Sequence, residues 1–136
     1  YSLIMQAMMK DRDFDPQGIR DKLFMKSQHL IELTQAGHIV GLHSHSHPVQ
    51  MHKMSFKEQQ REYQDNACFL QETLGSKPES MSHPMGRYDS ATLRILADLG
   101  IKLGFCSELD MRLTNGPLET MRRDHTRVLA EMRNRV

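Results

Sequence analysis

The clearest pattern in the sequence is an apolar stripe with helical spacing between residues 56 and 74. Its apolar positions, separated by seven, four, three and four residues, are Phe56, Tyr63, Ala67, Leu70 and Leu74. This spacing places them on one face of an α-helix. Before the stripe, Ser55 and Glu58 have the spacing of a capping box, and after it Gly75 is a typical helix end. We therefore predict a helix over 56–74.

Shorter patterns on both sides predict that helices and strands alternate along the chain. The predicted helices span 2–10, 27–36 with Ser27 as N-cap, 91–99 with Ser90 as N-cap, and a last segment that begins at Asp124. The predicted strands are the apolar runs 38–42, 80–82 and 101–106. Pro16 and Gly18 mark residues 11–18 as a loop. Alternating helices and strands are typical of βα units that form a parallel sheet, so we predict an α/β fold.

Histidines gather directly after the predicted strand 38–42. The chain has eight histidines, and five of them lie within fifteen residues: His38, His43, His45, His47 and His52. A second polar segment, His83-Pro84, follows the predicted strand 80–82. In a parallel sheet the residues that do chemistry gather beyond the C-terminal ends of the strands. We therefore expect both segments at the same edge of the sheet.

The spacing of these histidines allows several metal-binding pairs. Imidazole is a common ligand of zinc and similar ions. On a straight strand His43 and His47 would stand roughly 13 Å apart, so they can share one ion only if the loop curves. Gly41 before the pair and Pro48 after it permit such a curve. His43 with His45, or His45 with His47, would instead bind an ion from an extended strand. The residues themselves leave these pairs open, and we predict a metal site in this loop.

Residues 37–48 resemble the metal-binding motif of the polysaccharide deacetylases, carbohydrate esterase family four with its NodB-homology domain. The sequence Gly-His-Ile-Val-Gly-Leu-His-Ser-His-Ser-His-Pro matches a family motif that reads roughly Gly-His-x-Ile-Gly-x-His-(Ser/Thr)-x-x-His-Pro. The resemblance implies that His43 and His47 bind zinc or another divalent metal ion, and that His45 does not. It also implies a parallel-stranded, partial deformed (β/α) barrel of the NodB-homology type.

A second segment resembles the next motif of the family, commonly Arg-x-Pro-Tyr-Gly-x-Tyr, which forms one wall of a sugar groove. By this resemblance the substrate-binding residues are Ser82, His83, Pro84, Gly86, Arg87 and Tyr88. His83 is equally compatible with a hydrogen-bonded residue at a strand end. Residues 121–125 resemble a late segment of a subgroup associated with surface-polysaccharide biosynthesis. The resemblance covers residues 28–128 and implies an N-acetylated carbohydrate as the substrate.

The activity that the resemblance implies is metal-assisted hydrolysis of an acetamide. A divalent ion supplies activation of water and polarisation of the carbonyl group, a carboxylate accepts the proton of the water, and a histidine protonates the leaving amine. His125 is the candidate acid, and Asp124 is the candidate carboxylate that orients it. The alternative for His125 is a structural cap or a surface residue, which is the more frequent role of a histidine at a helix start.

The sequence also departs from the family pattern. Ser82 stands where the family has arginine, and Met85 stands where it has a groove aromatic. The Thr-Phe-Asp-Asp-Gly motif, which supplies the third metal ligand and the base, is absent. We therefore expect weak metal binding and negligible activity of the chain alone. Since the first residue is Tyr1 rather than Met, we also expect residues 1–136 to be a single, N-terminally incomplete domain. The alternative function is a non-catalytic module that binds metal or carbohydrate on the same scaffold.

Composition narrows the partners that the chain is expected to have. Eighteen Lys and Arg against 17 Asp and Glu give a net charge of +1, so the basic excess typical of nucleic-acid binders is missing and no nucleic-acid partner is predicted. No apolar run approaches the roughly 20 residues of a membrane span, and we expect a cytoplasmic protein without a transmembrane segment. Apolar neighbours predict that Cys68 and Cys106 are buried thiols. Nothing in the sequence indicates an oligomeric state.

Overall fold

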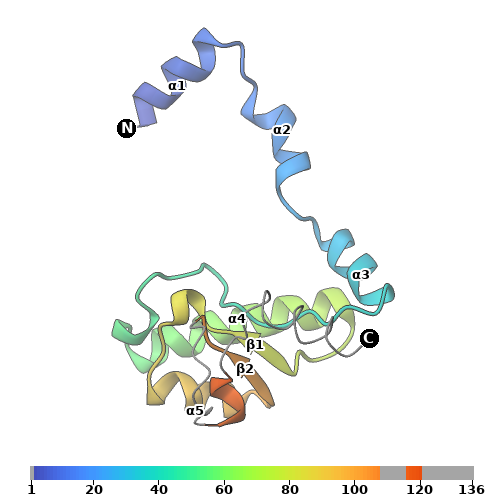
Figure 1. Cartoon of the computed structure of the whole chain (residues 1–136), viewed down its shortest axis with the longest axis vertical. Helices are drawn as coiled ribbons and strands as arrows, with labels where there is room; N and C mark the ends of the chain where they lie inside the picture. Colours follow the sequence, from blue (N-terminus) through green and yellow to red (C-terminus); the bar gives the residue numbers. More distant parts are fainter. Residues whose placement is uncertain (1, 108–115, 121–136) are drawn as a thin grey trace, which may run out of the picture. The chain divides into compact units, whose positions relative to one another are not determined.

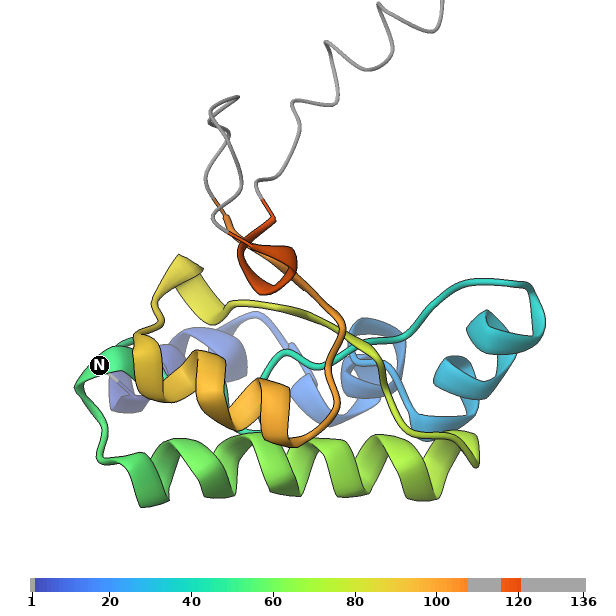
Figure 2. The same ribbon diagram turned by 90° about the horizontal axis from the view of Figure 1, so that it is seen from below.

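Two compact units make up the chain. The computed structural model describes residues 2–107 and 116–120. The first unit comprises residues 1–38, and the second comprises residues 39–136. In Figures 1 and 2 the first unit is coloured from blue to cyan, and the second runs on from teal through green to red. The expectation of one domain over residues 1–136 stays a prediction.

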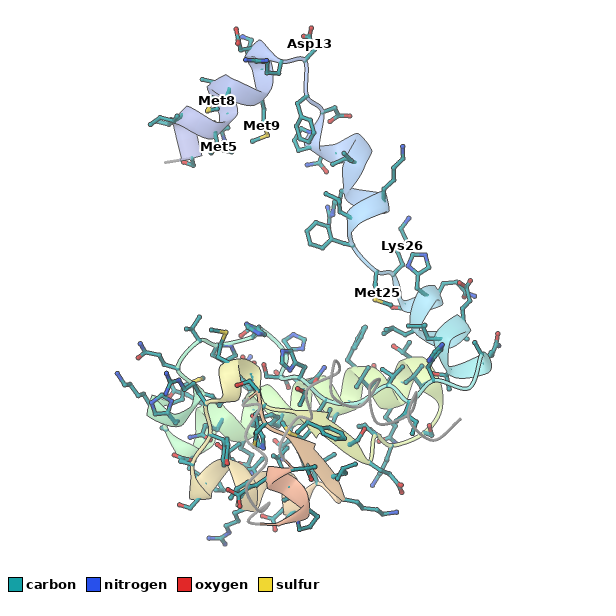
Figure 3. The ribbon with its side chains drawn as sticks, viewed as in Figure 1. Met5, Met8, Met9, Asp13, Met25 and Lys26 are labelled. Atoms are coloured by element: carbon teal, nitrogen blue, oxygen red, sulfur yellow. The ribbon has the colours of Figure 1, made fainter. Side chains whose placement is uncertain are left out.

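Three short helices form the first unit: α1 (Ser2–Asp11), α2 (Pro16–Leu23) and α3 (Ser27–Gln35). The first of them confirms the predicted helix 2–10. Its apolar residues Leu3 and Ile4 are 79% and 65% exposed, and no described side chain of residues 2–38 is buried. In Figure 3 the labelled methionines of α1 are Met5, Met8 and Met9. Within this unit the helices are therefore supported by their own hydrogen bonds and caps rather than by a core.

The helix α2 corrects the predicted loop over 11–18. Asp15 is its N-cap, and the carboxylate oxygens accept hydrogen bonds from the backbone amides of Gln17 and Gly18 at 2.9 and 3.0 Å. Pro16 occupies the start of the helix, where its missing N–H loses no hydrogen bond and its fixed φ suits the helix. Proline and glycine therefore lie inside this helix instead of interrupting the chain.

Two predicted N-caps are each wrong by one residue. Lys26 rather than Ser27 is the N-cap of α3, and Asp89 rather than Ser90 is the N-cap of α5 (Ser90–Asp98). At α5 the carboxylate of Asp89 accepts the backbone N–H of Thr92 at 2.9 Å. An ionised oxygen is a stronger acceptor for a helix N-terminus than a serine hydroxyl, so the aspartate takes this position.

A parallel pair of strands forms the sheet of the second unit. The strand β1 (Ser80–Ser82) pairs with β2 (Leu103–Phe105), with Met81 opposite Gly104. Single parallel bridges extend this order on both sides, from Leu42 to Met81 and from Phe105 to Thr120. These pairings confirm an α/β fold with parallel strands. The described residues do not themselves form a barrel.

The predicted strand 38–42 is longer than the pairing that forms. Only Leu42 joins the sheet: its amide donates to the Ser80 carbonyl at 2.9 Å, and its carbonyl accepts from the Ser82 amide at 2.9 Å. Ile39 is 87% exposed. Gly41 lies so close to β1 that a Cβ there would stand 2.6 Å from the Ser80 carbonyl oxygen. Only the last residues of the predicted strand 38–42 therefore approach β1, directly before the histidines.

The helix α4 (Phe56–Leu74) confirms the predicted helix and both of its ends. The Ser55 amide donates to the Glu58 carboxylate at 2.8 Å and the Glu58 amide to the Ser55 hydroxyl at 3.4 Å, which forms the capping box. Gly75 follows with a φ of 73°, in the left-handed region that favours glycine. Three short 3-10 helices complete the described elements: η1 (Met51–Lys53), η2 (Pro84–Gly86) and η3 (Pro117–Glu119). None of the helices in residues 2–107 and 116–120 is long and apolar enough to cross a membrane.

The core of the second unit lies where α4 and α5 pack side by side (Figures 1 and 2) and where the strands meet them. Its buried apolar residues are Leu42, Met51, Tyr63, Leu70, Met81, Ile95, Leu96, Ile101 and Cys106. Cys106 is buried as predicted, but Cys68 is exposed. The prediction for Cys68 is wrong because it lies about 100° around the helix from its stripe neighbour Ala67.

A buried polar cluster joins α4 to α5. Gln59 and Thr92 are both 0% exposed, and the Thr92 hydroxyl donates to the Gln59 side-chain oxygen at 2.6 Å. The Gln59 side-chain N–H₂ donates to the Met54 carbonyl at 3.1 Å and to the Asp89 carboxylate at 3.4 Å. Because buried polar groups are costly when unpaired, this cluster fixes how the two helices meet.

Replacing Thr92 with valine tests this cluster. Thr92→Val keeps the volume but leaves the buried Gln59 oxygen without the hydroxyl donor, so we expect a loss of about 1–3 kcal/mol in the free energy of unfolding. Urea denaturation measures the loss. The control is Thr73→Val, a half-buried position on α4. Equal effects of the two substitutions would show that the hydrogen bond contributes nothing specific.

The N-cap of α5 predicts a pH dependence of stability. Partial burial raises the pKa of Asp89, but hydrogen bonds from Thr92, Gln59 and the Ala91 amide outweigh it and hold the pKa below its ordinary value. A lowered carboxyl pKa stabilises the fold above the ordinary pKa of about 3.9, and this stabilisation is lost as the pH falls through the folded-state value. In Asp89→Asn the asparagine side chain still caps α5, but it has no carboxyl group that titrates. Urea midpoints from pH 7 to pH 3 should fall less steeply for Asp89→Asn than for the unchanged chain or for Asp98→Asn. Parallel curves would contradict this assignment.

Candidate active site

The histidine loop, residues 43–47, begins directly after Leu42 leaves the sheet. Two of its residues have left-handed backbone, Ser44 with a φ of 66° and His47 with a φ of 56°. The His47 amide donates to the buried Ser44 hydroxyl at 3.2 Å, which closes the turn. As a result the rings of His43 and His47 approach to 4.9 Å between centroids. The curvature that this pair needs in order to share an ion is therefore present.

The ring of His43 has a defined orientation and tautomer. Its Nδ1 lies 2.8 Å from the Ser82 carbonyl oxygen. Because a carbonyl only accepts, Nδ1 is the donor in this contact, and in the neutral tautomer that donates here the lone pair for a ligand lies on Nε2. Metal-binding histidines typically donate their second ring nitrogen to such an oxygen. Two rings bound to one tetrahedral ion through nitrogens at about 2.0–2.1 Å would have centroids about 5 Å apart. The donor chemistry and the spacing of His43 and His47 both fit a divalent ion.

Two side chains of α4 that the sequence motifs do not include hold the histidine loop. The Glu62 carboxylate accepts the amides of His45 and Ser46 at 3.0 and 2.8 Å and the Ser46 hydroxyl at 2.7 Å. The Asn66 side-chain oxygen accepts the His43 amide at 3.0 Å. Partial burial raises the pKa of Glu62, but the hydrogen bonds from Ser46 and His45 outweigh it and hold the pKa below its ordinary value. The only signal in the sequence is the spacing of Glu62 and Asn66, one helical turn apart.

The second motif divides into buried and exposed residues. His83 and Pro84 are buried, whereas Ser82, Met85 and Arg87 are exposed and Gly86 and Tyr88 are half-buried. The motif turns through η2, where Met85 has a φ of 53° and is 56% exposed. A Cβ at Gly86, whose φ is 63°, would clash with the Ser107 hydroxyl. Glycine is thus needed at the turn, and the exposed side chains stand next to the end of β1.

The buried histidine of this motif is part of a packed cluster. The His83 Nε2–H donates to the Leu118 carbonyl at 2.8 Å, and the ring stacks on Tyr88 with 4.2 Å between centroids. Burial lowers the pKa of His83, so the ring is neutral near pH 7. The Tyr88 hydroxyl donates to Glu119 at 2.9 Å, and burial raises its pKa. Of the two roles left open for His83, the hydrogen-bonded residue at a strand end agrees with these contacts.

Other candidate residues fall outside the part that the structure describes. Asp124 and His125, the candidate orienting carboxylate and the candidate acid, lie outside the described residues, and their roles stay predictions. Among residues 2–107 and 116–120, no group of three or more His, Cys, Asp or Glu side chains is placed to hold a metal ion. The described part thus brings together two candidate ligands, His43 and His47. His45 is exposed, and its backbone amide donates to the Glu62 carboxylate.

Fold and site together define an α/β protein with a convergent histidine pair at the edge of a parallel sheet. The chain belongs to the polysaccharide deacetylase family, because the sequence profile of that family matches residues 15–104. This match includes the histidine loop, the second motif and the helices α4 and α5. It confirms the resemblance that the two motifs indicated. A comparison with curated protein sequences gave no significant match.

Solved structures agree with this membership. The Streptococcus pyogenes deacetylase PplD, in complex with acetate, is 28% identical with a TM-score of 0.67, over 73% of this chain and 44% of that one. IcaB from Ammonifex degensii is 22% identical with a TM-score of 0.58, over 74% and 46%. A CE4 family pseudoenzyme from Bacillus anthracis is 16% identical with a TM-score of 0.52, over 71% and 35%. The chain spans less than half the length of each of these structures, and the last two comparisons concern the fold alone.

Metal titration of single variants tests the ligand assignment. We expect His43→Ala and His47→Ala to weaken Zn²⁺ or Co²⁺ binding by ~100-fold or more, because removal of a ligand exceeds the 10–100-fold typical of its hydrogen-bonding partners. His45→Ala should bind like the unchanged chain and is the matched control. Isothermal titration calorimetry measures all three. Equal losses, or a loss in His45→Ala alone, would overturn the assignment.

Proposed function

We propose that this chain is part of a metal-dependent deacetylase that removes the acetyl group from an N-acetylated sugar or polysaccharide precursor. The observation that carries the proposal is the convergence of His43 and His47, with the second ring nitrogen of His43 fixed on the Ser82 carbonyl. Family membership supports it. We further propose that the parallel strands belong to a partial deformed (β/α) barrel, and that the protein acts in surface-polysaccharide biosynthesis in the cytoplasm.

In this proposal different residues of the chain have different roles in the hydrolysis of the amide. His43 and His47 would hold zinc or another divalent ion. When bound, such an ion supplies polarisation of the acetamide carbonyl and activation of water. The exposed residues Ser82, Met85 and Arg87 form the wall that a sugar would contact, and buried His83 keeps that wall on the sheet edge. His125, oriented by Asp124, would donate the proton that the leaving amine needs.

The base of this reaction has no counterpart at its family position in this chain. The 136 residues contain no Asp-Asp-Gly sequence, and Glu62 already accepts three hydrogen bonds from the loop. Loss of a general base typically lowers the rate by 10²–10⁴-fold. We therefore propose that residues 1–136 alone hydrolyse an acetylated substrate at a negligible rate. Activity would require a further carboxylate at this site that acts as the base.

One observation favours a second function, a non-catalytic module that binds metal or carbohydrate. The positions that would meet a sugar, Ser82 and Met85, are exposed and differ from the family motif. The same fold is present in a CE4 family pseudoenzyme, so the scaffold does not by itself imply turnover.

Acetate release separates the two functions. The substrates are N-acetylglucosamine oligomers and nucleotide-linked N-acetyl sugars, with Zn²⁺ or Co²⁺ added and with chelator as a control. We expect metal-dependent release by the protein that carries this chain together with an Asp-Asp-Gly strand, and at least ~100-fold less by residues 1–136 alone. His43→Ala and His47→Ala should abolish release. Metal and sugar binding without release by the longer protein would favour the non-catalytic module, and robust turnover by residues 1–136 would show that another carboxylate serves as base.

A further inference from the structure

The helix α4 makes several hydrogen bonds to the histidine loop through its side chains. Four hydrogen bonds run from this loop to two side chains of α4, three to Glu62 and one to Asn66. Three of the four donors are the backbone amides of His43, His45 and Ser46. We propose that Glu62 and Asn66 are positioning residues that hold His43 and His47 in the geometry that binds an ion. This inference rests on the proposed metal site.

The loop is held from two sides. On one side the α4 side chains bind its backbone, and on the other the ring of His43 donates to the Ser82 carbonyl of β1. Both ends of the histidine pair are thereby restrained: His43 through its own amide and ring, and His47 through the adjoining residue Ser46. Both carboxylate oxygens of Glu62 accept hydrogen bonds from the loop, so this side chain positions the loop backbone.

The backbone of the loop explains why such restraint is needed. Ser44 and His47 have positive φ values of 66° and 56°, which are unfavourable for residues with a Cβ. Conformations of this kind persist only where surrounding contacts enforce them. Without the acceptors on α4, only the hydrogen bond from the His47 amide to Ser44 and the contact of the His43 ring with Ser82 still hold the turn. A loop that extends instead separates the two histidines by roughly 13 Å. The clamp formed by Glu62 and Asn66 therefore adds to these contacts and favours the curved loop in which the pair can share an ion.

Amide hydrogen exchange in the metal-free chain tests the clamp directly. We expect Glu62→Ala to raise the exchange rates of the His45 and Ser46 amides by ~5–10-fold, and Asn66→Ala to do the same at His43. Asn66→Asp retains the acceptor oxygen and should restore protection of His43. Glu72→Gln, an exposed glutamate on the same helix, is the matched control. If Glu62→Ala fails to fold, Glu62→Gln, which keeps one acceptor oxygen, takes its place with a smaller expected rise. Unchanged exchange in folded Glu62 and Asn66 variants would overturn the proposal.

Calorimetric titration with Zn²⁺ alone tests the consequence for the ligands. We expect the Glu62 and Asn66 variants to bind Zn²⁺ 10–100-fold more weakly than the unchanged chain, and Glu72→Gln to bind equally. Faster exchange with unchanged zinc affinity would overturn the positioning role. A chain that binds no Zn²⁺ in any form would overturn the metal site of the proposed function, and the exchange rates would still decide whether α4 restrains the loop.

Discussion

The two hydrogen bonds between the backbone of Leu42 and β1 are the contact on which the candidate site depends. They bring the incoming chain alongside β1 for a single residue and release it at the end of the strand. Ser82 contacts both Leu42 and the first residue of the loop, since its amide donates to the Leu42 carbonyl and its carbonyl accepts from the His43 ring. The same residue therefore fixes where the histidine loop starts and how the ring of His43 is oriented.

The helix α4 links this site to the stability of the unit. Gln59, Glu62, Tyr63 and Asn66 follow one another at spacings of three, one and three residues, so they share one side of the helix. Gln59 and Tyr63 are buried against the core, and Glu62 and Asn66 bind the loop. Because both sets lie on one rigid element, the packing that places α4 also places the acceptors for the loop. The position of the histidine pair is thus coupled to the core.

Much of this arrangement is predictable from the sequence, and the misses have physical causes. The helix over 56–74 is predictable because its period, capping box and glycine end all agree. The spacing of the histidines leaves three pairs open, and only the resemblance to the family motif selects His43 and His47; Gly41 and Pro48 permit the curve that this pair needs. The predicted strand over 38–42 is too long, since apolar residues pair only where a neighbouring backbone is present. The predicted loop over 11–18 is wrong because it treats Pro16 as a helix breaker, whereas proline is also favourable at the first position of a helix. Glu62 and Asn66 escape prediction because a polar pair on a helix gives no sign of which loop will fold onto it.

The departures from the family motifs affect different parts of the chemistry. The Ser82 contact that orients His43 is made by a backbone carbonyl, which any residue type at this position supplies. Serine in place of the family's arginine therefore leaves this support of the His43 ring intact and changes only an exposed side chain. Met85 likewise presents its side chain outward while its backbone completes the turn. These two departures accordingly change exposed side chains and leave the backbone contacts around the histidine loop in place. In the proposed function catalysis depends on a carboxylate base, and the contacts that shape the histidine loop do not by themselves distinguish a deacetylase from a non-catalytic module.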